Sequence, residues 1–293
     1  MLETMPEIRI HDLEYEAFKA NDGSYNLPGI HPTDDPMATK ATRNTEKVAD
    51  FMSTILDRKG DHIGTIKCVG PTRGTSLEWK NACWFPPCKQ AVYGQQLLDP
   101  DRRPDQYISL AENLGIVAHE MFHGVTCETA KLHYRGESGS LHESYSDIFA
   151  IIILNDRNKN IGKWNWELGR PFGQDGDPMR NFADPTLHEQ PDHWEKYREV
   201  EGLHYNCGIH NKAAYNLINA TYEYAPNKYL FDTATLSNLF YRTLCSLSRE
   251  ATFRESGLKL MSTAATIFRK NGSLQRRAEI AINKAFADVG ITL

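Results

Sequence analysis

The residues best suited to chemistry in this sequence are two histidines and a glutamate, His119, Glu120 and His123, in the pattern H-E-x-x-H. Residues four apart lie on one face of a helix, so both imidazoles can bind one metal ion, with Glu120 about 100° around the helix from His119. This arrangement is typical of hydrolases in which a metal activates water and a glutamate moves its proton. Because the pattern also arises by chance, the alternative is a surface helix with two unrelated histidines.

A catalytic zinc ion takes three protein ligands and keeps one position open for water, so a third ligand is needed. The metzincin pattern would place a histidine at position 129, but Thr129 stands there and excludes that class. Glu143 is the better candidate, because the 19 residues between it and His123 allow a turn and an antiparallel return of the chain. Asp147, one helical turn later, can accept the outer N–H of a ligating imidazole. For Glu143 and Asp147, the alternative is a solvated helix face.

The periodicity of apolar residues predicts the elements that must position these side chains. Two central helices are expected at 111–132 and 140–154, and they carry the candidate metal ligands. Residues 1–35 and 64–93 are expected to form strands and loops, and residues 162–203 a long, loop-rich segment. The other expected helices are 37–56, 207–224, 233–249, 254–270 and 273–289. The layout is a mixed α/β N-terminal lobe joined through the two central helices to a helical C-terminal lobe.

Length and composition exclude several classes of protein. The chain has 293 residues, 40% hydrophobic and 24% charged, which excludes collagen-like and disordered proteins. Its net charge of -5 predicts neither a nucleic-acid nor an anionic membrane partner. The longest apolar run, 148–154, is far shorter than the ~20 residues of a membrane span. The N-terminus shows no secretory signal, which predicts a soluble protein that is cytoplasmic or exported by a route not encoded in this chain.

The six cysteines form no C-x-x-C pair, which argues against a zinc ribbon or a thioredoxin-like site. Cys83 and Cys88 are close enough in sequence for a small disulfide loop, and free thiols are the alternative.

The segment from His119 to Ala150 resembles the zinc-site helix pair of the thermolysin family of neutral metallopeptidases, in which a glutamate follows H-E-x-x-H at this spacing. The resemblance extends over most of the chain, through NACW at 81–84, RNFADP at 180–185, GLHYNCGIHNKAAY at 202–215 and AFADVGI at 285–291. SYNLPG at 24–29 is similar to the start of the mature domain in the protealysin-like branch. The family implies a two-lobed α+β fold with the active-site cleft between a mixed lobe, 1–132, and a mainly helical lobe, 133–293.

The resemblance implies a zinc-dependent endopeptidase with one catalytic Zn²⁺. His119, His123 and Glu143 match the zinc ligands, and Glu120 matches the general base that takes a proton from the attacking water. Tyr134 and His204 match the pair that hydrogen-bonds the developing oxyanion. Glu199, with Glu201 a close rival, aligns with the acid that orients the oxyanion histidine. Apart from this resemblance, the sequence would suggest that Tyr134 is a core residue and that His204 is an ordinary loop histidine.

The family also implies how a peptide or protein substrate is held, and it leaves a proteinaceous inhibitor among the candidate partners. Asn81 and the backbone of Ala82 match an edge segment that pairs with an extended peptide. Arg180 matches an arginine that binds a substrate carbonyl, and the alternative is a surface salt bridge. Four residues fall where the family builds an apolar pocket for the residue after the scissile bond: Leu110, Ile116, Leu168 and Met179. We therefore expect a preference for bulky apolar side chains at that position.

The sequence departs from the family pattern at the metal sites. His142 replaces the asparagine that usually precedes the third ligand. Calcium needs six to eight oxygen ligands, and only Glu167 remains acidic among the family's paired calcium positions, where the other residues are Gly115, Leu154, Asn165 and Arg170. We expect that calcium site to be absent, with Arg170 pairing Glu167 instead.

Two other functions compete with the endopeptidase. A related class of zinc aminopeptidases places its third ligand where His142 stands. A catalytically restricted or inactive thermolysin-like binding protein is the alternative from another functional class, although every expected catalytic residue type is present.

Overall fold

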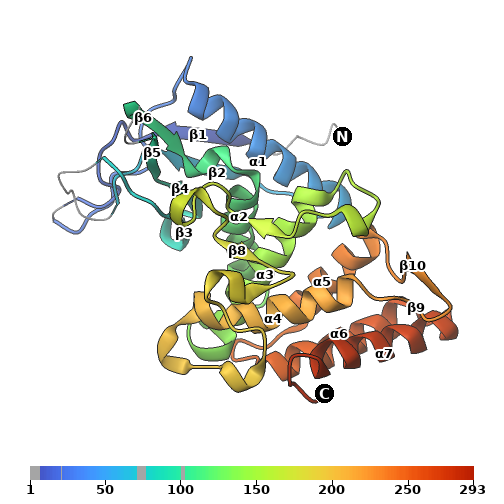
Figure 1. Ribbon diagram of the computed structural model, residues 1–293. Helices are drawn as coiled ribbons and strands as arrows, with labels where there is room; N and C mark the ends of the chain where they lie inside the picture. Colours follow the sequence, from blue (N-terminus) through green and yellow to red (C-terminus); the bar gives the residue numbers. More distant parts are fainter. Residues whose placement is uncertain (1–6, 21, 71–76, 100–102) are drawn as a thin grey trace, which may run out of the picture. The chain divides into compact units, whose positions relative to one another are not determined.

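The computed structural model describes residues 7–20, 22–70, 77–99 and 103–293 (Figure 1). It divides into two compact units, one made of Met1–Gly124 and Gly169–Asp177, the other of Val125–Leu168 and Pro178–Leu293. The first unit is mixed helix and sheet and the second is mainly helical, which confirms the predicted α+β class. The predicted domain boundary after residue 132 stays a prediction.

A four-stranded mixed sheet in the order β1-β2-β4-β3 lies in the first unit (Figure 1). β1 (Ile8–Asp12) is parallel to β2 (His62–Ile66), which is parallel to β4 (Gln90–Tyr93), and β3 (Ala82–Phe85) runs antiparallel to β4. Because β3 comes last in this order, the segment that begins at Asn81 lies at an edge of the sheet.

Helix α1 (Pro36–Ile55) packs against β1 and β2. The side chain of Asp35 accepts hydrogen bonds from the N–H groups of Met37 and Ala38, and Pro36 occupies the first helical turn, so the start of the helix is strongly specified. Val48, at 0% exposure, lies on the buried face that the periodicity predicts. The helix expected at 37–56 is confirmed.

A β-hairpin and a short turn lead into the helix that carries His119 and His123. β5 (Gln95–Asp99) and β6 (Arg103–Ser109) pair antiparallel, and η2 (Leu110–Glu112) follows. Ser109 and Glu112 form a reciprocal capping box there, so the segment predicted as the first turn of the helix is a separate 3-10 turn. Helix α2 (Leu114–Glu128) is therefore shorter than the predicted range 111–132.

The second unit is built on α3, whose residues from Ser138 to Ile153 are buried. It packs against α4, α5 and α6, and α7 packs against α4 and α6 (Figure 1). The helices of this unit are α3 (Gly136–Asn155), α4 (Leu203–Ile218), α5 (Thr233–Ser246), α6 (Phe253–Ile267) and α7 (Gly272–Ala287). Each predicted helix is present, with shifted ends.

The prediction that a helix continues to residue 224 is wrong. Helix α4 ends at Ile218, and β9 (Thr221–Tyr222) and β10 (Ala225–Tyr229) form a hairpin after it. The Asn219 side chain donates a hydrogen bond to the carbonyl of Tyr215, one of the carbonyl groups in the last turn of the helix, where few N–H donors of the helix remain. Pro226 disfavours helical backbone at the residue before it, so the chain cannot resume the helix at once.

The segment 162–203 is loop-rich, as predicted. It contains the two-residue strands β7 (Glu167–Leu168) and β8 (Arg180–Asn181), which pair antiparallel. The remaining 3-10 turns of the described chain are η1 (Pro86–Cys88), η3 (Ile161–Lys163), η4 (Gln174–Gly176), η5 (Pro185–His188), η6 (Trp194–Lys196) and η7 (Glu199–Glu201). Among the described residues, every helix is too short or too polar to cross a bilayer.

Candidate metal centre and substrate site

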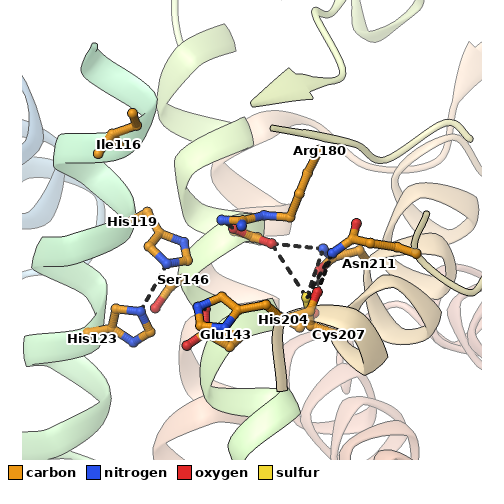
Figure 2. Close-up of polar contacts among 12 residues, drawn as sticks. Ile116, His119, His123, Glu143, Ser146, Arg180, His204, Cys207 and Asn211 are labelled. Carbon is orange, nitrogen blue, oxygen red and sulfur yellow. Dashed lines mark hydrogen bonds and ion pairs between the residues drawn. The ribbon is translucent and has the colours of Figure 1, made fainter. Parts of the chain in front are cut away.

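His119 and His123 lie on successive turns of α2 with their rings at right angles (Figure 2). Their Nε2 atoms are 2.9 Å apart, and both side chains are buried. The structure therefore brings the two imidazoles together as their four-residue spacing predicts.

Gly124, the residue after His123, allows an indole to pack closely against this helix. A Cβ atom at Gly124 would lie 2.7 Å from Cζ2 of Trp84 on β3, closer than two carbon atoms approach. The missing side chain thus lets the edge strand of the sheet support the turn that carries His123.

Glu120 is buried near two groups of the sheet, Cys83 and Tyr93. Burial, followed by the charge of Glu120, raises the pKa of the Cys83 thiol to about 12. The same two causes, in the same order, raise the pKa of Tyr93 well above its ordinary value. Both groups stay neutral near pH 7, so neither places a second negative charge beside the carboxylate of Glu120.

In the second unit, Glu143 is completely buried on α3 and two polar side chains meet it. The hydroxyl of Tyr134 donates a hydrogen bond to Oε1, and Nε2 of His204 lies 3.2 Å from Oε2. Tyr134 and the side chain of His204 are both more than half exposed, so each reaches from the surface to a buried carboxylate. The structure brings these three predicted residues together.

His119, His123 and Glu143 form the group of described side chains suited to hold a metal ion, with candidate ligand atoms within 4.8 Å of one another. Two imidazoles and a carboxylate are a donor set that catalytic zinc uses. Two nitrogens bound to one zinc ion at a tetrahedral angle lie about 3.4 Å apart, close to the separation of the two imidazoles. All three side chains are buried, where a carboxylate needs a compensating charge. The residues fit a zinc ion.

Asp147 and Arg180 form a buried ion pair. Nη2 of Arg180, on β8, lies 2.7 Å from Oδ1 of Asp147, on α3, and the Asp147 side chain is completely buried. The amide of Asn211 donates to the other carboxylate oxygen at 2.9 Å, and the Cys207 thiol lies 3.9 Å from it. Figure 2 shows Arg180 of β8 together with Cys207 and Asn211 of α4. The surface salt bridge considered for Arg180 is therefore wrong, because its partner lies in the core.

Sequence reasoning missed Asn211 as a partner of Asp147. The available signal was a set of polar residues at helical spacing inside apolar helices, Ser144 and Asp147 on α3 and Cys207 and Asn211 on α4. Such residues must find hydrogen-bond partners when the helix is buried.

The candidate peptide-binding residues are described within each unit. The carbonyl of exposed Asn81 accepts a hydrogen bond from Gly94, and Ala82, half-buried, begins β3. The N–H of Met179, which is half-buried, donates to the carbonyl of Leu168 at 2.8 Å. Leu110, Ile116 and Leu168 are buried. The roles of these residues stay predictions.

The departures from the family pattern have distinct surroundings. Glu199 is exposed, and its role in orienting His204 stays a prediction. The ring of His142 meets that of Tyr134 edge-on at 5.5 Å. Arg170 lies 3.5 Å from Asp177 within its unit, and its predicted pairing with Glu167 stays a prediction. Cys83 and Cys88 are free thiols.

Two family models together match nearly the whole chain. The thermolysin metallopeptidase catalytic domain matches residues 7–127, and the thermolysin metallopeptidase alpha-helical domain matches residues 130–291. Among solved structures, the precursor of protealysin, a metalloproteinase from Serratia proteamaculans, superposes with a TM-score of 0.74 at 22% identity, covering 98% of this chain and 88% of that one. At this identity the match shows a shared fold.

Similar sequences include a bacillolysin of Brevibacillus brevis, which is 29% identical over 290 residues covering 94% of this chain and 51% of that protein. The neutral protease NprE of Bacillus pumilus is 30% identical over 241 residues, which cover 79% of this chain and 71% of that protein. The chain spans about half the length of the bacillolysins it matches. The family models and these relatives agree with the metal-binding group on α2 and α3, and the chain belongs to the thermolysin metallopeptidase family.

Proposed function

We propose that the chain is a zinc-dependent endopeptidase that hydrolyses peptide bonds in peptide or protein substrates. The observation that carries this proposal is the buried group His119, His123 and Glu143, with Glu120 inside the same H-E-x-x-H motif. A bound zinc ion supplies a Lewis acid that polarises a carbonyl and lowers the pKa of water toward neutrality. The protein's own side chains supply the proton transfers and the hydrogen bonds.

Glu120 acts as the general base. Its carboxylate takes a proton from the attacking water and delivers it to the nitrogen of the leaving amine, so that cleavage of the C–N bond yields a carboxylic acid and an amine. Its position beside Cys83 and Tyr93 supports this role, because both groups are neutral and add no negative charge next to its carboxylate.

Tyr134 and His204 stabilise the transition state by donating hydrogen bonds to the carbonyl oxygen as negative charge develops on it. Support comes from their meeting at Glu143, the proposed zinc ligand. Both side chains remain open to solvent, and a substrate carbonyl can therefore replace their present contacts.

Arg180 binds a carbonyl of the substrate, and Asn81 and Ala82 pair with its backbone at the edge of the sheet. Leu110, Ile116, Leu168 and Met179 accept the side chain that follows the scissile bond, and their apolar character supports a preference for a bulky apolar residue there.

The test measures zinc content together with hydrolysis of blocked peptides that carry leucine, phenylalanine or glycine after the scissile bond. We expect about one zinc ion per chain in the wild type and in Glu120→Gln. We expect cleavage by the wild type, fastest before leucine or phenylalanine, and kcat lower by a factor of about 10²–10⁴ in Glu120→Gln. Zinc in both proteins without cleavage by either would instead identify an inactive binding protein.

A further inference from the structure

A chain of hydrogen bonds in the core of the second unit links α3, α6 and α4, and it begins and ends on α3. It joins Tyr145 to Ser256 at 2.9 Å, Ser256 to His210 at 2.9 Å and His210 to Ser144 at 2.7 Å. It continues from Ser144 to Asn211 at 2.6 Å and from Asn211 to Asp147 at 2.9 Å. Every member is at most 1% exposed. The chain therefore lies in a dry environment, where a broken hydrogen bond is costly.

The direction of each hydrogen bond follows from its acceptor end. The Asp147 carboxylate only accepts, so the amide nitrogen of Asn211 donates to it and the amide oxygen of Asn211 faces Ser144. Ser144 has one proton and gives it to that oxygen. The Ser144 oxygen must then accept from Nδ1 of His210, which therefore carries the imidazole proton.

The same reasoning continues to the other end. With its proton on Nδ1, His210 accepts at Nε2 from the Ser256 hydroxyl, and Ser256 in turn accepts from the Tyr145 phenol. Burial raises the pKa of Tyr145, so the phenol keeps the proton that it donates. Burial lowers the pKa of His210 to about 3, which keeps the imidazole neutral. The polarity runs one way, from Tyr145 to the carboxylate of Asp147.

The chain ends on the carboxylate that holds Arg180. Asn211 occupies Oδ2 of Asp147 while Arg180 occupies Oδ1, so the hydrogen bond from Asn211 sets the rotation of the carboxyl group and with it the position of the guanidinium. Asn211 cannot rotate its amide without turning the amide oxygen toward the Asp147 carboxylate. The hydroxyl of Ser144, which accepts from His210, holds the amide oxygen in place at the other end.

We infer that His210 is a positioning residue for substrate binding: acting through Ser144 and Asn211, it holds Asp147 and Arg180 in the orientation in which the guanidinium can donate to a substrate carbonyl. This inference rests on the proposed endopeptidase function, in which Arg180 binds the substrate. His210 itself touches no substrate, because it is 1% exposed and surrounded by the rings of Tyr145, Phe253 and Phe286.

The test compares four variants with the wild type in steady-state peptide hydrolysis. Ser144→Ala and His210→Leu interrupt the chain. His210→Asn keeps a donor, because its amide nitrogen takes the place of Nδ1. Ser140→Ala is the matched control, since Ser140 is a fully buried serine one turn earlier on α3 whose hydroxyl donates to the carbonyl of Gly136 on its own helix.

We expect KM to rise about ten-fold in Ser144→Ala and His210→Leu with kcat little changed, as when a hydrogen bond to a charged group is lost from substrate binding. His210→Asn should recover most of the loss, and Ser140→Ala should match the wild type. In an Arg180→Met background, Ser144→Ala should no longer raise KM, because the arginine through which it acts is gone. A general structural defect would lower the folded fraction instead and would persist in that background.

A second readout does not depend on activity. The ¹⁵N NMR signals of the His210 ring should show the Nδ1–H tautomer and stay constant from pH 5.5 to 8. A titrating ring, the Nε2–H tautomer, or an unchanged KM in Ser144→Ala with an active wild type would each overturn the inference. A wild type that binds zinc but cleaves no peptide would overturn the proposed function itself, and this inference with it.

Discussion

The guanidinium of Arg180 and the carboxylate of Asp147 lie 2.7 Å apart with side chains that are only 10% and 0% exposed. Two charges buried in this way are each costly to leave alone. Burial by itself lowers the pKa of Arg180, but the negative charge of Asp147 outweighs it, so the pKa of the guanidinium lies above its ordinary value. The pair joins a two-residue strand in the loop-rich segment to a central helix, so it ties a loop with little regular structure to the core.

Asp147→Asn should destabilise the protein strongly. The substitution keeps the shape of the side chain but removes the negative charge that pairs with Arg180 in the core, and breaking a buried ion pair costs about 3–5 kcal/mol. Urea unfolding of the metal-free proteins measures the change. The double variant Asp147→Asn with Arg180→Met should recover part of the loss, and a single variant as stable as the wild type would show that the pair is solvated in solution.

Gly124→Ala should also destabilise the protein, although alanine is the better helix former by about 1 kcal/mol. The added Cβ would lie 2.7 Å from the rigid indole of Trp84, and overpacking of this kind costs about 1–3 kcal/mol. Thermal unfolding of the variant and of Gly124→Ala with Trp84→Leu checks the cause. If the clash is responsible, the second substitution restores stability; equal losses in both backgrounds would contradict it.

His210 should make the protein sensitive to acid. Its pKa is about 3 in the folded protein, against an ordinary value of 6.5, because burial disfavours the charged ring. The unfolded chain therefore binds a proton between these values that the folded protein does not. The stabilising effect of a neutral His210 is present in full above pH 6.5 and declines as the pH falls toward 3, by about 1.4 kcal/mol per pH unit.

The measurement for His210 is urea unfolding of metal-free wild type and His210→Asn at pH 7, 6, 5 and 4.5. The difference in unfolding free energy between the two proteins should shrink as the pH falls, because the variant lacks the group that the unfolded chain protonates. Parallel pH profiles for the two proteins would mean that His210 has the same pKa in the folded and in the unfolded state.

Removal of calcium and removal of zinc should have different effects. Glycine, leucine, asparagine and arginine at positions 115, 154, 165 and 170 provide no carboxylate for a paired calcium site. A calcium-selective chelator should therefore leave the melting temperature unchanged. A zinc chelator should lower it and abolish hydrolysis, because a bound ion stabilises the folded state that binds it. A large drop in melting temperature with the calcium chelator would overturn the calcium prediction.

Local periodicity was sufficient to predict the helices and to predict that two of the three candidate metal ligands, His119 and His123, meet. The separation of His119 and His123 is a property of helical geometry, so two residues four apart meet on one face whatever surrounds the helix. The helix expected at 37–56 was found for the same reason, since its apolar stripe and the Asp35–Pro36 start are local signals. The limit of this reasoning is visible at residue 219, where the capping of α4 and a proline favour a hairpin over more helix.

The sequence by itself determined the class of fold, the pairing of the two histidines and, through the family's motifs, which side chains to examine. Only the tertiary structure decided which partners the buried polar groups take: Arg180 lies 33 residues from Asp147 along the chain, and His210 lies 66 residues from Ser144. The spacing of residues says that a polar group on a buried face needs a partner, because an unsatisfied polar group in the core is costly. Which partner arrives depends on how loops and helices distant in sequence pack, and no local pattern encodes that packing.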